Sequence, residues 1–165
     1  MYFKKSRGQQ RKYKMFLRWL ETFEPFKQTD KEEEHFHVPC GTWLGLPKTS
    51  GKIKTAVCRK WIEKTEEFIA NKPKDLPFCK VVAAITAPDV RNSQIIIFYD
   101  EKYYSSFWKR NNKYQKWTEI EKGSFAKERN ITTSLPEKGY LEENFDEDFT
   151  YRTYIWFYGE WPKDI

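Results

Sequence analysis

Residues 79–100, CKVVAAITAPDVRNSQIIIFYD, decide the fold of this chain. Two almost unbroken apolar runs, Val81 to Ile85 and Ile95 to Phe98, stand on either side of APDVRN, which is rich in turn-forming residues. Apolar runs of this kind are typical of central strands that are covered on both faces. Because a short turn joins the two runs, the sequence predicts two neighbouring antiparallel strands within a sheet.

Three helices are predicted around this pair of strands. The first, over residues 7–24, has apolar side chains at three- and four-residue spacing: Tyr13, Phe16, Leu17, Leu20 and Phe23. The second helix starts from an N-cap at Thr49 or Ser50 and is stopped by Asn71-Lys72-Pro73. The third helix follows Asp100, whose carboxylate is predicted to cap it.

Two further strands complete the predicted sheet. Residues 34–38 alternate as a short strand, and FTYRTYIWFYGEW at 149–161 is rich in β-branched and aromatic residues. Residues 109–141 are patterned weakly, and we expect loops with a short strand or helix there. The sequence therefore predicts one α+β domain over residues 1–165, with a mainly antiparallel or mixed sheet of about four strands and about three helices. Residues 1–10 are either part of it or a flexible basic N-terminus.

Composition limits the function classes. The chain has 165 residues and no apolar stretch long enough to span a bilayer, so we expect a soluble, cytoplasmic protein. Its three cysteines form no CxxC pair, which argues against a disulfide framework or a zinc ribbon. Walker, GxGxxG, GxSxG and HExxH motifs are absent from the sequence, and no cofactor is expected.

The stretch HFHVPCG at 35–41 contains both histidines of the chain and one of its cysteines. On a strand, His35 and His37 project to the same face, about 7 Å apart along the backbone. This spacing allows a metal site with Cys40, or a thiol nucleophile at Cys40 beside His37. The favoured interpretation is structural, because no further ligand is specified by the pattern.

Charge is distributed unevenly along the chain. Residues 1–20 carry seven Lys or Arg and no acid, whereas EENFDED at 142–148 carries five acids and no base. Cations interleaved with aromatic rings suit nucleic acid, because phosphates bind the cations and bases stack on rings. The candidate nucleic-acid residues are Arg11, Lys12, Lys14, Arg18 and Trp19. Internal pairing of the basic and acidic segments is the alternative.

The chain also resembles a family of short bacterial proteins that is catalogued only as a domain of unknown function. The resemblance extends from about Arg11 to Trp161 and rests on four features. These are the basic aromatic first helix, His37-Val38-Pro39, SQIIIFYDEKYYSSFWKR at 93–110, and a last strand that ends in Tyr158-Gly159-Glu160. It carries over no catalytic residue.

Motif-poor α+β proteins of this size are often binding modules, including immunity proteins that neutralise a toxin. We therefore expect a non-catalytic, immunity-like protein-binding module, with nucleic-acid binding as the alternative and a metal- or thiol-dependent enzyme at His35, His37 and Cys40 as the second. Aromatic and Arg side chains are favoured at tight interfaces. The expected partner-binding residues are Arg152, Tyr154, Trp156, Tyr158, Asp146, Glu147 and Asp148.

Overall fold

The computed structural model describes residues 3–27, 33–39, 51–87, 92–114, 116–120, 139–146 and 149–162. Its helices and strands are, in chain order, α1 (Phe3–Leu20), β1 (His35–Pro39), α2 (Gly51–Ala70), β2 (Lys80–Ala87), β3 (Gln94–Phe98), α3 (Glu101–Tyr114), β4 (Lys116–Ile120), β5 (Gly139–Asp146) and β6 (Phe149–Gly159). The predicted α+β class, with three helices and an antiparallel sheet, is confirmed.

The sheet has the strand order β1-β3-β2-β6-β5-β4, and every neighbouring pair is antiparallel. Its four predicted strands are β1, β3, β2 and β6. Two more strands, β5 and β4, extend the sheet beyond β6. The acidic segment is thus partly a strand, because residues 142–146 pair with β6. Its polar composition hid this strand from sequence reasoning, since strands are recognised by apolar or β-branched runs.

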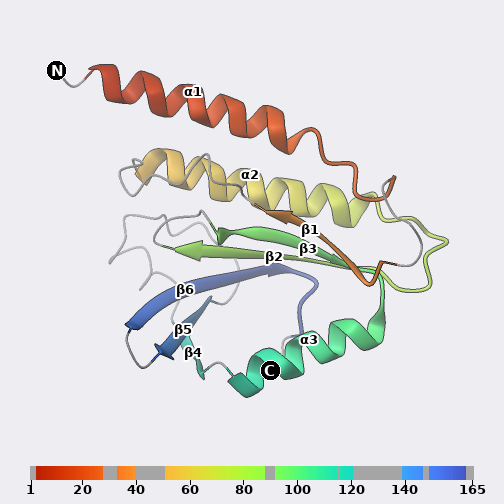
Figure 1. The fold of residues 1–165 in the computed structure, drawn as a ribbon. Coiled ribbons are helices and arrows are strands. Elements are labelled where there is room, and N and C mark those ends of the chain that lie inside the picture. The colour runs from red at the N-terminus through yellow and green to blue at the C-terminus, as the bar shows by residue number, and fades with distance from the viewer. Residues whose placement is uncertain are drawn as a thin grey trace.

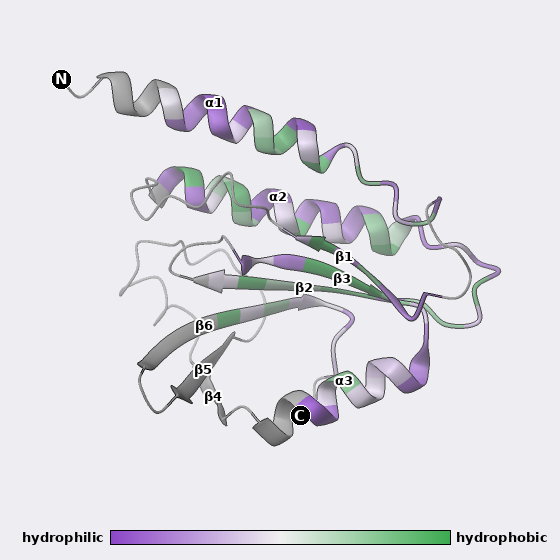
Figure 2. Ribbon diagram, viewed as in Figure 1, coloured by the Kyte–Doolittle hydropathy of each residue, from purple (hydrophilic) through white to green (hydrophobic). Residues whose placement is uncertain are grey.

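Helices cover both faces of the sheet (Figure 1). Helix α2 packs on β2, and α1 lies outside α2. Helix α3 covers the opposite face and contacts β3. Figure 2 shows that hydrophobic residues gather on the central strands, whereas much of α1 is hydrophilic. A strand between two helical layers must be apolar on both faces, which explains the unbroken runs at 81–85 and 95–98.

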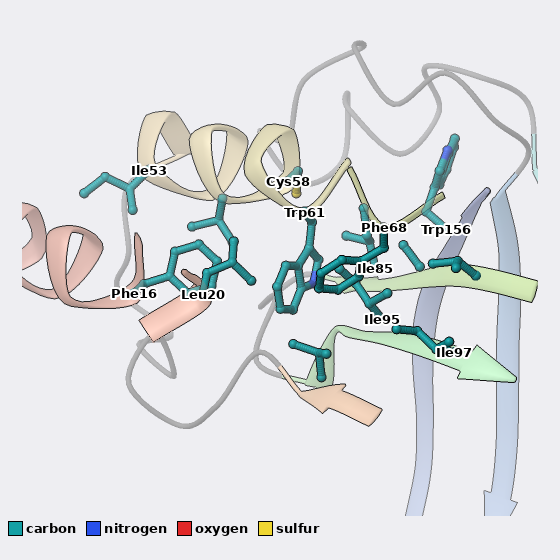
Figure 3. Close-up of a cluster of buried hydrophobic side chains, with 14 residues drawn as sticks. Phe16, Leu20, Ile53, Cys58, Trp61, Phe68, Ile85, Ile95, Ile97 and Trp156 are labelled. Carbon is teal, nitrogen blue, oxygen red and sulfur yellow. The ribbon is translucent and has the colours of Figure 1, made fainter. Parts of the chain in front are cut away.

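Two hydrophobic clusters form the core, one on each face. Alternate residues of β2 divide between them: Val81, Ala83 and Ile85 face α2, whereas Val82 and Ala84 face α3. The α2-side cluster is drawn in Figure 3, where side chains of α1 and α2 meet those of β2, β3 and β6. Burial on both faces stabilises this part of the sheet through the hydrophobic effect.

Aromatic rings attach α1 to the rest of the fold. Phe16 of α1 is fully buried, and its ring lies edge-on to Trp61 of α2 with centroids 5.6 Å apart. Leu20 is buried beside it (Figure 3). The apolar face of the first helix, predicted from its spacing, therefore packs on α2 rather than directly on the sheet.

The helix boundaries differ slightly from those predicted. Helix α1 begins at Phe3, so residues 3–10 are helical, as their Lys, Arg and Gln content favours. It ends at Leu20, where Thr22 donates from both its backbone N–H and its hydroxyl to the carbonyl of Trp19 and closes a turn. Helix α3 continues to Tyr114, into the weakly patterned region. Its predicted cap is confirmed, because Asp100 accepts from the backbone N–H of Tyr103.

Candidate functional site

The two histidines lie on β1, at the edge of the sheet. In the antiparallel register, His35 pairs with Phe98 and His37 with Ile96. Phe36 and Val38 alternate with them and pack into the α2-side core. Both imidazoles therefore lie on the α3 side, as the spacing of two residues predicts, and their ring centroids are 4.6 Å apart.

Neighbouring side chains hold both rings in place. The ring of His35 stacks on Tyr103 of α3, with centroids 4.5 Å apart and an angle of 5° between the planes. Nδ1 of His37 lies 3.1 Å from Oε1 of Gln94 on β3. This oxygen can only accept, so Nδ1 of His37 donates and the hydrogen-free nitrogen is Nε2.

The electrostatic environment keeps His37 neutral. Its burial lowers the pKa, and the neighbouring His35 lowers it further, against the opposing effect of the hydrogen bond to Gln94. Nδ1 of His35 is buried and has no hydrogen-bond partner within the described residues. One of these two half-buried imidazoles thus has an unsatisfied nitrogen that is able to bind a ligand. A strand end with only a structural role does not need such a nitrogen.

No third metal ligand joins the histidines in the part of the chain that the structure describes. No group of three His, Cys, Asp or Glu side chains is found among those residues. Cys40, the predicted third member, lies outside the described residues. The other two cysteines offer no nucleophile, because burial raises the pKa of Cys58 to about 12 and the pKa of Cys79 to about 11 and so keeps both thiols protonated.

The basic residues of α1 are divided between its two faces. Arg11, Lys14 and Arg18 are exposed, whereas Lys12 is partly buried. Trp19 turns toward the core, where its ring lies 4.7 Å from Phe23 between centroids. The predicted nucleic-acid residues thus include three exposed cations, but their aromatic member is partly buried against the α2-side core.

One further side chain belongs to this exposed surface. Met15 is 43% exposed and is the one large hydrophobic side chain that is exposed among those described. It lies four residues after Arg11 and three before Arg18, which places all of them on one side of the helix. We call Arg11, Lys14, Met15 and Arg18 the outer face of α1. Sequence reasoning missed Met15, because its spacing differs from that of the core residues by one position.

The basic helix and the acidic strand lie apart. Helix α1 packs on α2, whereas β5 lies between β6 and β4 at the other end of the sheet (Figure 1). None of Arg11, Lys14 and Arg18 takes part in an ion pair within the described residues. The side chains of the acidic segment lie outside the described ones, so the predicted internal pairing stays a prediction.

The last strand carries four of the seven predicted partner-binding residues, Arg152, Tyr154, Trp156 and Tyr158, and the last two of these face the core. Trp156 is 2% exposed and packs in the α2-side cluster, so its ring is not available to a partner. Tyr158 is partly buried and donates to Glu66 of α2. These side chains have the composition of a protein interface because they form one within the chain, with α2.

The other predicted partner-binding residues are described only by their backbone pairing. Arg152 pairs with Glu143, Tyr154 with Leu141 and Asp146 with Phe149, whereas Glu147 and Asp148 lie outside the described residues.

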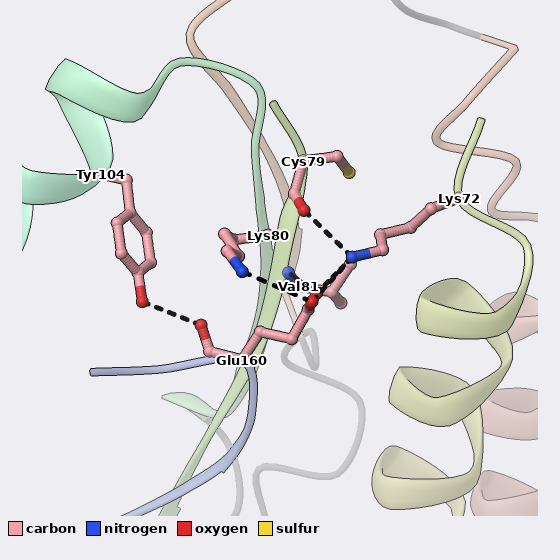
Figure 4. A network of polar contacts seen from close by, with 6 residues as sticks. All are labelled: Lys72, Cys79, Lys80, Val81, Tyr104 and Glu160. Atoms are coloured by element: carbon pink, nitrogen blue, oxygen red, sulfur yellow. Dashed lines mark hydrogen bonds and ion pairs between the residues drawn. The ribbon is translucent and has the colours of Figure 1, made fainter. Parts of the chain in front are cut away.

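Glu160 is the centre of a polar network that sequence reasoning missed (Figure 4). Its carboxylate accepts from Lys72 at 2.7 Å and from the backbone N–H of Val81 at 3.0 Å. Its backbone carbonyl accepts from the hydroxyl of Tyr104 at 2.9 Å. The network joins the end of α2, the start of β2 and α3. A Gly-Glu pair at the end of an aromatic strand was its one signal in the sequence.

The described helices include none with the length and apolar character needed to cross a membrane. A family model described as "Protein of unknown function (DUF3916)" matches residues 17–160. No curated protein matches the chain, and no solved structure does so.

Proposed function

The chain belongs to the DUF3916 family, whose description assigns no activity, and we propose that it is a non-catalytic protein-binding module that recognises an acidic partner through the outer face of α1. The observation that carries this proposal is an exposed Met15 among three exposed cations that no described carboxylate neutralises.

The composition of this face favours a protein over other anionic partners. Arg and Met are enriched at protein interfaces, and an exposed Met adapts readily to an apolar contact. A cationic rim around it would speed association with an acidic surface and fix its orientation. From Arg11 to Arg18 the face extends for about 10 Å along the helix axis, which is two turns of the helix.

This surface replaces the C-terminal strand as the proposed contact. Trp156 and Tyr158 are engaged by α2, so the exposed helix that lies outside α2 is the more accessible candidate.

A pull-down from nuclease-treated native lysate tests the proposal, with three tagged proteins compared. These are the unaltered chain, Arg11→Glu/Lys14→Glu/Arg18→Glu, and a control with equal charge change on α3, Lys102→Glu/Lys109→Glu/Arg110→Glu, whose three residues are also exposed. We expect one partner to be retained by the unaltered chain and by the α3 variant, and lost by the α1 variant. Equal retention by the α1 variant would exclude the outer face of α1.

Nucleic acid is the second candidate, favoured by the seven cations and no acid in residues 1–20. Met15→Ala separates the two. A protein partner that covers Met15 should bind this variant more weakly, whereas binding to phosphates should be indifferent to it and should fall steeply with salt. An inhibitory, immunity-like role is a narrower form of the first candidate, and an activity assay of the captured partner with and without this chain would test it.

A further inference from the structure

We infer that His35 and His37 form a two-imidazole site for a late first-row divalent cation of the Cu²⁺ or Ni²⁺ type, with Gln94 holding His37 in the tautomer that can bind it. This inference concerns the opposite side of the sheet from α1 and does not depend on the proposed protein partner.

The separation of the two rings fits adjacent positions on one metal ion. A metal-bound imidazole nitrogen lies about 2.0–2.1 Å from the ion, which places the ring centroid about 3.2 Å from it. If the nitrogen–metal–nitrogen angle is a right angle, the two ring centroids are about 4.5 Å apart. If that angle is tetrahedral, they are about 5.2 Å apart. The observed separation is 4.6 Å. This separation is close to that of two imidazoles in adjacent right-angle positions, as in a tetragonal Cu²⁺ or Ni²⁺ site.

Hydrogen bonding prepares His37 for this role. Oε1 of Gln94 accepts from Nδ1 of His37, so the lone pair lies on Nε2. A ligating histidine usually has such an acceptor on its other nitrogen, because it fixes both the ring and the tautomer. Gln94 supplies this acceptor without adding a charge.

His35 adds the second ring and an unexplained nitrogen. Its Nδ1 is buried without a hydrogen-bond partner among the residues described, which is an unfavourable state that a bound ion or its water would relieve. Stacking on Tyr103 limits rotation of this ring and so favours a fixed position beside His37. Each histidine would contribute one ring nitrogen.

The remaining coordination positions would be taken by water. No cluster of three protein ligands is present in the described residues, and structural zinc sites use four. A site with two imidazoles and open positions suits Cu²⁺ most, because Cu²⁺ binds nitrogen ligands more tightly than the other divalent ions of this series.

The small number of histidines allows a clean test. The chain has two in all, so every imidazole signal comes from this site. Untagged protein carrying Cys40→Ser, which removes the neighbouring thiol, is titrated with Cu²⁺ alone and followed by electron paramagnetic resonance and calorimetry. We expect one ion per chain, with coupling to two imidazole nitrogens.

Variants then assign the ligands. His35→Ala and His37→Ala should each weaken Cu²⁺ binding by tenfold or more, and Gln94→Ala should weaken it about tenfold because it loses the outer acceptor. The matched control is Ser105→Ala, a change at an exposed position on α3. Unchanged binding in His35→Ala/His37→Ala, or the absence of binding to the parent protein, would overturn the inference.

A second measurement does not depend on the folding of the variants. In the parent protein, Ni²⁺ should broaden or shift the ring ¹⁵N signals of both histidines at one equivalent. An effect on a single histidine, or on neither, would contradict a shared site.

Discussion

Gly159 lies against the backbone carbonyl of Val81, so closely that a Cβ at this position would stand 2.6 Å from the carbonyl oxygen. Its φ of +101° is one that residues with a side chain rarely adopt. Two hydrogen bonds follow at once, since the N–H of Glu160 donates to Val81 O and the Glu160 carboxylate accepts from Val81 N–H. The close approach is therefore what allows Glu160 to reach β2.

Gly159→Ala should destabilise the protein by about 1–3 kcal/mol from backbone strain, and by more once the contact with Val81 is included. Urea unfolding measures this difference. Gly8→Ala is the matched control, because Gly8 lies in α1 with nothing within 4 Å of the Cβ that the substitution adds. This substitution should raise the free energy of unfolding by roughly 0.5–1 kcal/mol. Equal stability of the two variants would contradict the role of Gly159.

Glu160→Ala should cost about 1–3 kcal/mol, because it leaves the N–H of Val81 without its acceptor and leaves the ammonium of Lys72 with the carbonyl of Cys79 but no carboxylate. The two charged side chains are each 24% exposed, so water replaces the lost contacts only in part. Glu24→Ala is the control, since its ion pair with Lys27 is mostly exposed and should be worth well under about 1 kcal/mol. A double-mutant cycle with Lys72→Met isolates the pair.

Phe16→Ala should destabilise the protein by about 3–5 kcal/mol, because it removes a fully buried ring from the contact with Trp61. Since this contact attaches α1 to α2, hydrogen exchange should accelerate more in α1 than in β2. Met15→Ala changes the adjacent, exposed residue and should leave both stability and exchange nearly unchanged. Uniform acceleration across the two elements would argue against separate attachment of α1.

Cys58 and Cys79 should resist alkylation in the folded protein at pH 8 and react only after unfolding. Burial raises the pKa of these thiols to about 12 and about 11, from a usual 9.0. The folded state thus retains protons that the unfolded state loses. Stability from this source is complete below pH 9. It declines as pH rises from about 9 to the folded-state pKa of each thiol, which is about 11 for Cys79 and about 12 for Cys58. Mass spectrometry of a Cys40→Ser variant after brief iodoacetamide treatment checks the resistance to alkylation. Urea unfolding at pH 8 and pH 10 checks the decline in stability.

Rapid native alkylation of Cys79 at pH 8 would be the contrary outcome. It would restore a thiol-based activity to consideration, because the thiolate is the reactive form.

Local pattern was sufficient for much of this protein. The apolar runs at 81–85 and 95–98 predicted the central antiparallel pair. Helical spacing predicted α1, and start or stop signals predicted α2 and α3. The alternation of β1 placed His35 and His37 on one side. These features depend on residues close in sequence, so periodicity and start or stop signals reveal them.

Tertiary structure decided which of those faces meet and what is left exposed. Trp156 has the same character as an interface residue, and only the packing of α2 on β6 makes it core. Strands β4 and β5 form where their sequence is polar, because pairing with an existing neighbour stabilises them. The contacts of Gln94 with His37 and of Glu160 with Lys72 join residues 57 and 88 positions apart. No local pattern specifies such pairs, since they depend on how the sheet orders its strands and on which helix covers each face.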